Sequence, residues 1–234
     1  MNLSRNKTEL LMCFAIRPLT ESDIPRVDEI ESSAFPTFWP RTPFKRDLHN
    51  RRVGYLVSTR VLAAEEIRDR VSAPQPSNDH SLLIRLMAGI RSRFGHTQLI
   101  ADRPPDIPLG FVSIWFLTDE AHITAIAVEE VWRGRGLGEL LLIGAIENSI
   151  RKNSRVVTLE VRISNDTAIS LYEKYNFRRV GVRKGYYTDN REDAAIMTTE
   201  PIHSLSYRQK FSELREAYLQ RHGSLEITLG APAN

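Results

Sequence analysis

The sequence is poor in cysteine and has no long apolar run. Cys13 is the only cysteine among 234 residues. A single thiol makes neither an internal disulfide nor a cysteine metal cage, so we expect a reducing, cytoplasmic location. No apolar run approaches the ~20 residues of a membrane span. The apolar residues 10–16 end at Arg17 and Pro18 without a small-residue cleavage site. They predict a first strand, and no membrane association is expected.

The sequence also lacks a strong charge bias and a metal-ligand pattern. It has 32 Lys and Arg residues against 29 Asp and Glu residues, a net charge of +3. This small excess of positive charge does not indicate a basic binding surface, so we do not expect direct nucleic-acid binding. The six histidines follow no metal-ligand spacing, and no His-Glu-x-x-His string occurs. We therefore expect no bound metal.

Strand and helix patterns alternate along most of the chain. Apolar stretches predict strands at about 10–16, 55–62, 110–117, 122–128, 155–162, 180–187 and 194–197. Helical spacing predicts four helices. One follows a capping box at Thr20, two cover 137–152 and 165–175, and the last lies in the C-terminal tail and ends at Gly223. Asn176 can adopt the left-handed conformation that ends a helix. The chain has no internal repeats.

Residues 64–108 differ in character from the rest of the chain. Prolines punctuate them, and they fall in the hairpin between the second and third predicted strands. The segment is too short to bury a core of its own, so we expect an insertion and no second domain. Within it, residues 81–94 carry an apolar helical stripe whose only charges are Arg85, Arg91 and Arg93. Such a helix either packs on its own domain or docks on a membrane or RNA surface.

The strongest chemical signal is a glycine-rich turn between a strand end and a helix start. Residues 128–138 read VEEVWRGRGLG. Backbone N–H groups at a helix N-terminus bind anions, and Gly136 and Gly138 let a ligand approach the backbone closely. Arg133 and Arg135 can add positive charge. No Walker loop occurs, and neither possible Rossmann fingerprint has its third glycine. The turn therefore indicates another phosphate ligand, or else only a tight connection.

This turn resembles a known loop. Arg133-x-x-Gly136-x-Gly138 is similar to the Q/R-x-x-G-x-G/A loop that holds the diphosphate of acetyl-CoA in the GNAT superfamily of N-acetyltransferases. Downstream, the chain resembles the RimI-type ribosomal-protein-alanine N-acetyltransferases in the strings LEVR (159–162), SN (164–165), AISLYE (168–173), NF (176–177), YY (186–187) and REDAAIM (191–197). The resemblance covers about 12–63 and 109–202.

The resemblance implies an α/β fold of the α+β kind. A single GNAT-like domain over 12–202 would have a mixed, mostly antiparallel central sheet flanked by helices, with splayed fourth and fifth strands. The insertion at about 64–108 would interrupt it between the second and third strands, and 203–234 would form a C-terminal helical tail. We expect a monomer or a weak dimer.

The resemblance also implies acetyl-CoA as co-substrate, without a metal. The implied cofactor-binding residues are Ile126, Ala127 and Val128 on one strand, Arg133, Gly134, Arg135, Gly136, Leu137, Gly138 and Glu139 at the turn, and Asn165. The pantetheine arm would add itself like a strand in the gap between the splayed strands. Phe38 and Trp39 on one side and Tyr186 and Tyr187 on the other would bind the substrate. Residues 191–193 belong either to this rim or only to a hairpin.

Two residues are candidates for the chemistry. Glu160 lies in an otherwise apolar strand, where a carboxylate is either a base or an ion-pair partner, and the resemblance favours the base. Tyr172 would protonate the departing thiolate. A tyrosine of pKa about 10 gives its proton to a thiolate of about 8.5 only with help, so hydrogen bonding is an equal alternative. Tyr172 could also be only a core residue.

The resemblance implies an N-α-acetyltransferase that acts by direct attack on a small-subunit ribosomal protein with an N-terminal alanine. An α-amine (pKa about 7.7) is easier to deprotonate than lysine (about 10.4), by near 3.7 kcal/mol. Two alternatives stay open. One is an acetyltransferase of the same fold that acts on lysine or on a small amine. The other is a non-catalytic module that binds acyl-CoA and takes part in an assembly. The insertion and the tail would then be its interaction surfaces.

Overall fold

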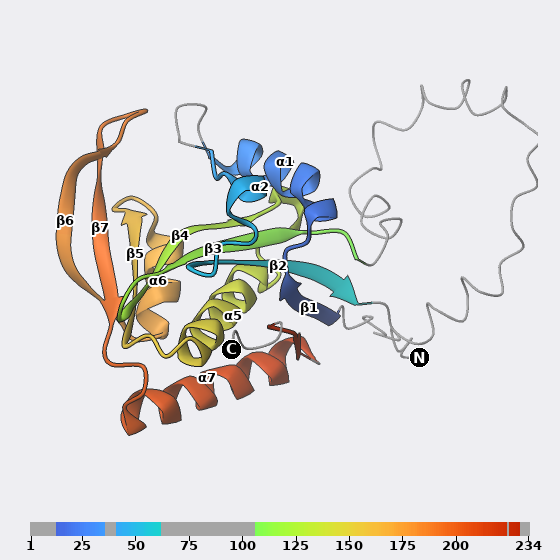
Figure 1. Cartoon of the computed structure of the whole chain (residues 1–234). Helices are drawn as coiled ribbons and strands as arrows, with labels where there is room; N and C mark the ends of the chain where they lie inside the picture. Colours follow the sequence, from blue (N-terminus) through green and yellow to red (C-terminus); the bar gives the residue numbers. More distant parts are fainter. Residues whose placement is uncertain (1–12, 36–40, 62–105, 224, 230–234) are drawn as a thin grey trace, which may run out of the picture.

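The computed structural model describes residues 13–35, 41–61, 106–223 and 225–229, and it has one central sheet (Figure 1). The strands are β1 (Cys13–Pro18), β2 (Val53–Val61), β3 (Gly110–Phe116), β4 (Glu120–Val128), β5 (Val156–Arg162), β6 (Phe177–Tyr187), β7 (Glu192–Thr199) and β8 (Leu225–Ile227). Their order in the sheet is β6-β7-β5-β4-β3-β2-β1-β8. Only the β4–β5 and β1–β8 pairs are parallel. The predicted mixed, mostly antiparallel sheet is therefore confirmed.

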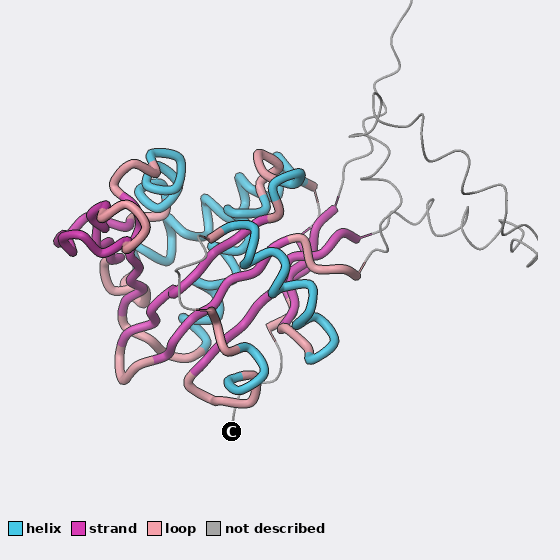
Figure 2. The backbone as a smooth tube through the Cα atoms, turned by 90° about the horizontal axis from the view of Figure 1, so that it is seen from above, coloured by secondary structure: helices cyan, strands magenta, loops and turns pink. Residues whose placement is uncertain are grey.

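Helices cover both faces of the sheet. The helices are α1 (Ile24–Ala34), α2 (Phe44–Asp47), α5 (Leu137–Arg151), α6 (Asp166–Lys174) and α7 (Leu205–His222), with 3-10 turns η1 (Glu21–Asp23) and η3 (Glu130–Trp132). In Figure 1, α1 and α2 lie on one face, and α5 and α7 lie on the other. Figure 2 shows the strands running side by side across the molecule below α1 and α2. None of the described helices is long and apolar enough to cross a bilayer.

Helix α5 is buried more completely than its sequence suggests. Its pattern predicts an outward face that includes Glu147 and Arg151. In the structure α7 covers that face, and Arg215 of α7 donates to Glu147 at 2.7 Å. All residues from 140 to 146 are buried. The helix lies between the sheet and α7, so it anchors the turn at its N-terminus rigidly.

The fourth and fifth strands splay apart, as predicted. Their ladder runs only from the Glu120–Val156 pair to the Ile123–Leu159 pair, although both strands continue. A bulge lies at the next residue, because Ser113 pairs with Ala125 and Ile114 with Ile123, so Thr124 is skipped in the ladder with β3 and contacts Ser113 through its hydroxyl. A bulge bends its strand, which accounts for the separation of β4 from β5 at this level.

The insertion site is also where the sequence places it. β2 ends at Val61, β3 begins at Gly110, and the two strands pair antiparallel. The helix predicted at 81–94 lies outside the described residues. The domain limits and the helical tail as a separate unit stay predictions. The start of β6 differs from the prediction: it is Phe177 and not residue 180, because the first residues of β6 pair with the end of β7.

Candidate active site

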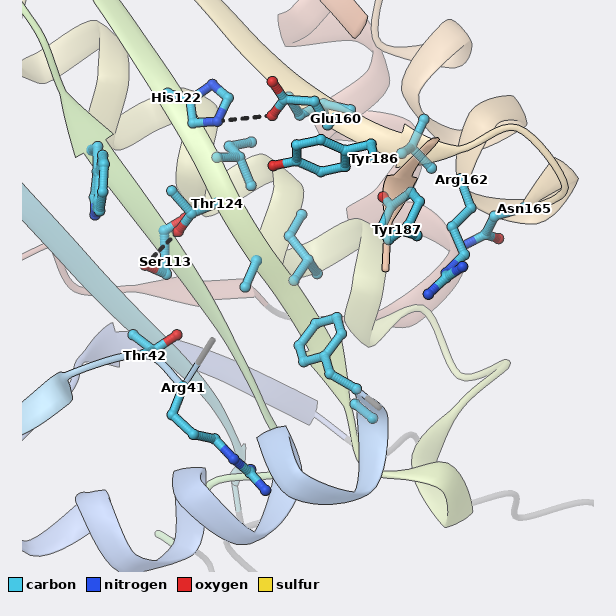
Figure 3. A pocket seen from close by; sticks show the side chains of 18 of the residues that line it. Arg41, Thr42, Ser113, His122, Thr124, Glu160, Arg162, Asn165, Tyr186 and Tyr187 are labelled. Carbon is cyan, nitrogen blue, oxygen red and sulfur yellow. Dashed lines mark hydrogen bonds and ion pairs between the residues drawn. The ribbon is translucent and has the colours of Figure 1, made fainter. Parts of the chain in front are cut away.

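A cavity of about 790 Å³ opens where β4 and β5 part (Figure 3). Phe35, Thr42 and Pro43, which follow α1, line one side of it, and Tyr186 and Tyr187 line the other. The tip of the β6–β7 hairpin rises on the same side of the sheet as α1 and α2, which gives the cavity its two lips (Figure 1). The predicted substrate residues Phe38 and Trp39 lie outside the described residues, so their role stays a prediction.

Glu160 lies in the wall of this cavity and is also ion-paired. Its side chain is 7% exposed, with His122 Nε2 3.0 Å from Oε2 and Arg183 Nη2 3.0 Å from Oε1. Burial alone would raise the pKa of Glu160. The hydrogen bond from His122 and the charges of His122 and Arg183 outweigh burial, so the pKa lies below its ordinary value. The structure therefore shows the ion-pair role of Glu160, and its role as a base stays a prediction.

Sequence reasoning missed His122 and Arg183. His122 pairs with Thr158 in the ladder, so its side chain shares the sheet face that carries Glu160 two residues further on. A polar residue on the alternating strand 122–128 was the signal that could have pointed to it. Arg183 reaches Glu160 from β6, which is two strands away in the sheet. No local pattern predicts that contact.

Tyr172 and Asn165 line the same cavity as Glu160. Asn165 is the N-cap of α6, and its side chain accepts the Ala168 N–H at 3.2 Å. Tyr172 lies further along α6, with its ring 5.7 Å from that of Phe177. Burial raises the pKa of Tyr172 to about 12. The structure therefore brings three predicted site residues together, with a tyrosine that holds its proton firmly.

The aromatic lip is fixed by two arginines. The rings of Tyr186 and Tyr187 meet edge to face at 5.3 Å. Arg183 lies over Tyr186 at 5.5 Å, and Arg162 lies over Tyr187 at 3.9 Å. Each arginine is also ion-paired, Arg183 to Glu160 and Arg162 to the hairpin turn. The position of both rings is thereby coupled to β5.

The acidic residues after the lip hold the hairpin together. Arg162 donates to both oxygens of Asp189, at 2.9 and 2.8 Å. Glu192 accepts from Arg162 at 3.1 Å and from the Ser164 N–H at 2.9 Å. Asp193 accepts the Lys184 ammonium at 2.7 Å. These contacts show a hairpin role for residues 192 and 193, while Glu192 also reaches the cavity wall.

The glycine-rich turn has the geometry of an open helix N-terminus. Gly134 (φ 74°) and Gly136 (φ 84°) are left-handed, and Gly136 is the N-cap of α5. Trp132 is buried and anchors the turn to the core. A Cβ placed on Gly134 or Gly138 would meet nothing within 4 Å. The backbone N–H groups that begin α5 are therefore approachable by an anion.

The two arginines of the turn have local partners. Arg133 donates from Nε to the carbonyl of Val128 at 3.1 Å, and Arg135 lies 5.2 Å from the ring of Trp132. Both side chains therefore lie beside the turn, where their charge adds to the helix dipole. The structure places Ile126 in the cavity wall, while Ala127 is buried.

The end of α7 forms a wall of this turn. A Cβ on Gly136 would be 2.6 Å from the ring of His222. That ring stacks on Tyr218 at 4.5 Å, and burial together with the charge of Arg221 lowers the pKa of His222. No local pattern predicts that the tail reaches the glycine-rich turn, because His222 and Gly136 are 86 residues apart (222 − 136).

The side chain of Glu139 points away from the turn. Its Oε1 accepts from Lys174 at 2.6 Å, Tyr175 at 2.7 Å and Arg221 at 3.0 Å. Burial would raise the pKa of Glu139, but these hydrogen bonds and charges hold it below its ordinary 4.5. Only the backbone N–H of Glu139 can serve the predicted cofactor contact, while its carboxylate joins α5, α6 and α7.

Comparison with known proteins identifies the fold. Residues 24–177 match the family described as "Acetyltransferase (GNAT) family". The chain belongs to this family. A putative ribosomal protein bS18-alanine N-acetyltransferase of Bacillus subtilis is 33% identical over 184 residues, covering 78% of this chain and 93% of that protein. An N-alpha-acetyltransferase of Saccharolobus solfataricus is 42% identical over 97 residues, covering 40% of this chain and 58% of that protein.

Solved structures agree. The crystal structure of the ribosomal-protein-S18-alanine N-acetyltransferase from Escherichia coli has a TM-score of 0.57 and 25% identity, covering 82% of this chain and 96% of that chain. Arabidopsis thaliana NAA60 in complex with acetyl-CoA has a TM-score of 0.55 at 19% identity, with 80% and 99% covered, and shows the fold alone. The protein is therefore an acetyltransferase of the GNAT fold, and the resemblance to RimI-type enzymes is confirmed. Among the described residues, no group of His, Cys, Asp and Glu is placed to hold a metal ion.

The Glu139 cluster predicts how the stability of this acetyltransferase depends on pH. Glu139→Gln should lower the free energy of unfolding by about 1–3 kcal/mol at pH 7, because it removes the charge that three donors share, of which the Tyr175 hydroxyl is buried. The folded pKa is lowered, so this contribution is complete above the ordinary 4.5 and is lost as the pH falls through the folded pKa. Urea unfolding of both proteins at pH 7 and at acidic pH measures it.

The matched control is Glu147→Gln on the same helix. Its pair with Arg215 is more exposed (21% and 38%, against 10% for the Glu139 side chain), so the loss should be under about 1 kcal/mol. Equal losses for both variants, or a Glu139→Gln loss that does not shrink with acid, would contradict the assignment.

Proposed function

We propose that the protein transfers the acetyl group of acetyl-CoA to the α-amine at the N-terminus of a protein. By analogy with the relatives named above, the proposed substrate is a small-subunit ribosomal protein that begins with alanine, modified in the cytoplasm. The observation that carries the proposal is Glu160. A buried carboxylate stands in the cavity wall where two parallel strands part, and β4, one of these strands, leads to the open N-terminus of α5.

The edge of β4 and the start of α5 support the proposed coenzyme site. The backbone edge of β4 beyond Ile123 has no strand neighbour on the β5 side among the described strands, and an extended pantetheine arm can pair with it. The N–H groups that begin α5 would bind the diphosphate. The thioester would then lie at the parting of the strands, within the cavity that holds Glu160. An N–H of β4 near Ile126 would stabilise the oxyanion of the tetrahedral intermediate.

The chemistry is direct transfer. A neutral amine attacks the thioester carbon, Glu160 takes the amine proton, and the intermediate expels the thiolate. Tyr172 would act on that thiolate. With a pKa of about 12 against about 8.5 for a thiol, full proton transfer is uphill by about 5 kcal/mol. A hydrogen bond from Tyr172 to the developing thiolate is therefore the favoured role.

The lowered pKa of Glu160 favours an α-amine as the substrate. A carboxylate below its ordinary pKa is a weak base, and it demands a substrate that is already partly neutral. At pH 7 about one-sixth of an α-amine of pKa 7.7 is neutral, against less than about one-thousandth of a lysine of pKa 10.4. The site is thus better matched to protein N-termini than to lysine side chains.

Mass spectrometry of paired peptides tests the function. Peptides with a free N-terminal alanine and one internal lysine are incubated with acetyl-CoA, next to the same peptides with a blocked N-terminus. We expect a single acetyl group on the free N-terminus and none on the blocked peptide. Acetylation confined to lysine, or to a polyamine offered in parallel, would contradict this proposal. It would favour the alternative of an acetyltransferase that acts on lysine or on a small amine.

A further inference from the structure

Glu31 is a buried carboxylate that has no part in the chemistry described above. It lies near the end of α1, four residues after Val27 and one after Ile30, and both of these are buried in the core beside the sheet. Residues four apart share one face of a helix, so Glu31 projects from the packed face of α1. Only 1% of the residue is exposed. A charge at such a position is costly unless hydrogen bonds compensate for its burial.

The compensating donors come from Thr42. Both oxygens of the Glu31 carboxylate accept the Thr42 N–H, each at 3.2 Å, and Oε1 also accepts the Thr42 hydroxyl. The backbone carbonyl of Glu31 accepts the Phe35 N–H at 3.0 Å. Glu31 therefore holds Phe35 through its main chain and Thr42 through its side chain, although these two residues are seven positions apart (42 − 35).

The residues that Glu31 holds belong to one wall of the reaction cavity. We call Phe35, Thr42 and Pro43 the first lip, because they line the cavity on the side opposite the aromatic lip. Figure 3 shows Thr42 across the cavity from Tyr186. Glu31 itself is not one of the described residues that line the cavity. Its influence on a substrate in the cavity is therefore indirect and passes through the first lip.

The core holds Thr42 from its other side. The Thr42 carbonyl accepts the Phe44 N–H at 2.8 Å. The buried ring of Phe44 lies 5.1 Å from that of Tyr55 and 5.3 Å from that of Phe111. Loss of the Glu31 contact would thus release the first lip from α1, while Phe44 keeps α2 in the core. We expect the effect of such a loss to be local.

The form of the contact distinguishes Glu31 from other buried acids. Within the part of the chain that the structure describes, Asp23, Asp47 and Glu139 are also buried, and each lies beside a basic side chain. The two oxygens of Glu31 instead receive the N–H and the hydroxyl of a single residue, Thr42. Hydrogen bonds to a carboxylate are stronger than those to a neutral acceptor, so this arrangement fixes the position of one lip residue closely.

We propose that Glu31 is a positioning residue for the amine substrate, because its carboxylate fixes the first lip against which the substrate chain lies. The inference rests on the proposed function. A protein N-terminus that reaches Glu160 must pass between the first lip and the aromatic lip, so the place of Thr42 determines how well the chain is held. The coenzyme site at the start of α5 lies outside this contact. Glu31 should therefore act on binding of the amine and leave binding of acetyl-CoA unaffected.

Glu31→Gln tests the proposal at nearly constant volume. Glutamine has one acceptor oxygen, and its NH2 group is a donor that cannot accept from Thr42. We expect the KM for a peptide with N-terminal alanine to rise by about tenfold, with kcat and the KM for acetyl-CoA close to those of the wild type. The matched control is Glu29→Gln, the same change on α1 at a side chain that is 67% exposed and paired with Arg26. It should keep the wild-type KM for the peptide.

Thr42→Val tests the contact from the other partner and spares the buried acid. It removes the hydroxyl and keeps the backbone N–H, so the peptide KM should rise by less than in Glu31→Gln. Thr42→Ser restores a hydroxyl and should recover most of that loss. The double variant Glu31→Gln, Thr42→Val should have a peptide KM no higher than that of Glu31→Gln alone, because both changes break one contact. Increases that multiply would show two independent effects and overturn the inference.

Amide NMR checks the contact without turnover. In Glu31→Gln the Thr42 amide proton should shift and exchange faster with solvent, because it loses a charged acceptor. An unmoved Thr42 amide overturns the inference. A wild-type peptide KM in a variant whose amide has shifted does so too, as does an equal rise of the KM for acetyl-CoA. If the wild type acetylates lysine or a small amine and no α-amine, the proposed function fails, and the KM for the accepted amine then decides the role of Glu31.

Discussion

Glu160→Gln is expected to lower kcat for N-terminal acetylation by about 10²–10⁴-fold while acetyl-CoA binds with unchanged affinity. Glutamine has nearly the volume of glutamate and can still accept a hydrogen bond from Arg183. It cannot take up the amine proton. Because Glu160 lies on β5, apart from the glycine-rich turn, its loss should leave coenzyme binding intact. Steady-state kinetics on a peptide and calorimetric titration with acetyl-CoA measure the two quantities.

The control variant is Glu147→Gln, which makes the same chemical change on α5 away from the cavity. It should keep wild-type kcat. Thermal unfolding of both variants shows whether the fold is retained. An unchanged kcat in Glu160→Gln would remove Glu160 as the base. If the Glu160→Gln variant binds acetyl-CoA without turnover and still fulfils the role of the wild type in the cell, the alternative of a non-catalytic assembly module is favoured.

Gly136→Ala is expected to raise the Kd for acetyl-CoA by about tenfold or more and to destabilise the fold by about 1–2 kcal/mol. Gly136 has φ 84°, which an L side chain adopts at a cost, and the added Cβ would lie 2.6 Å from the ring of His222. Either the turn or the end of α7 must move. Since the amides that begin α5 are the proposed diphosphate site, a shifted turn misaligns them. Calorimetry and thermal unfolding measure both effects.

Gly138→Ala is the matched control two residues further on. Gly138 lies in the first turn of α5, and a Cβ there meets nothing within 4 Å. Alanine is also a better helix former than glycine by about 1 kcal/mol. The variant should fold at least as stably as the wild type and should bind acetyl-CoA. Wild-type affinity in Gly136→Ala would show that the turn does not hold the coenzyme.

Local sequence patterns located most of the framework. The apolar period of α5 and the left-handed glycines of the turn are properties of neighbouring residues, so the start of α5 was predicted at its observed residue, Leu137. The strand 122–128 and the helix 165–175 were likewise found to within two residues of the observed elements. Glu160, Tyr172 and Asn165 were predicted from motif strings, and the fold gathers them in one cavity. Their chemical roles stay predictions.

Contacts between distant segments were beyond the reach of these patterns. His122 meets Glu160 because β4 and β5 pair in one particular register, and Arg183 joins them from β6, the edge strand that pairs with β7. The burial of the outer face of α5 depends on the tail helix. These are non-local pairings, which no period along a single segment encodes.

The sequence by itself determined the class of this protein: a chain with a glycine-rich helix start, a carboxylate in an apolar strand and a tyrosine on the following helix, each placed by its near neighbours. Only the tertiary structure decided what surrounds that carboxylate and where the cavity beside it lies. The physical reason is distance along the chain. Backbone conformation follows from adjacent residues, whereas the ionisation of Glu160 depends on groups 23 and 38 positions away, Arg183 (183 − 160) and His122 (160 − 122).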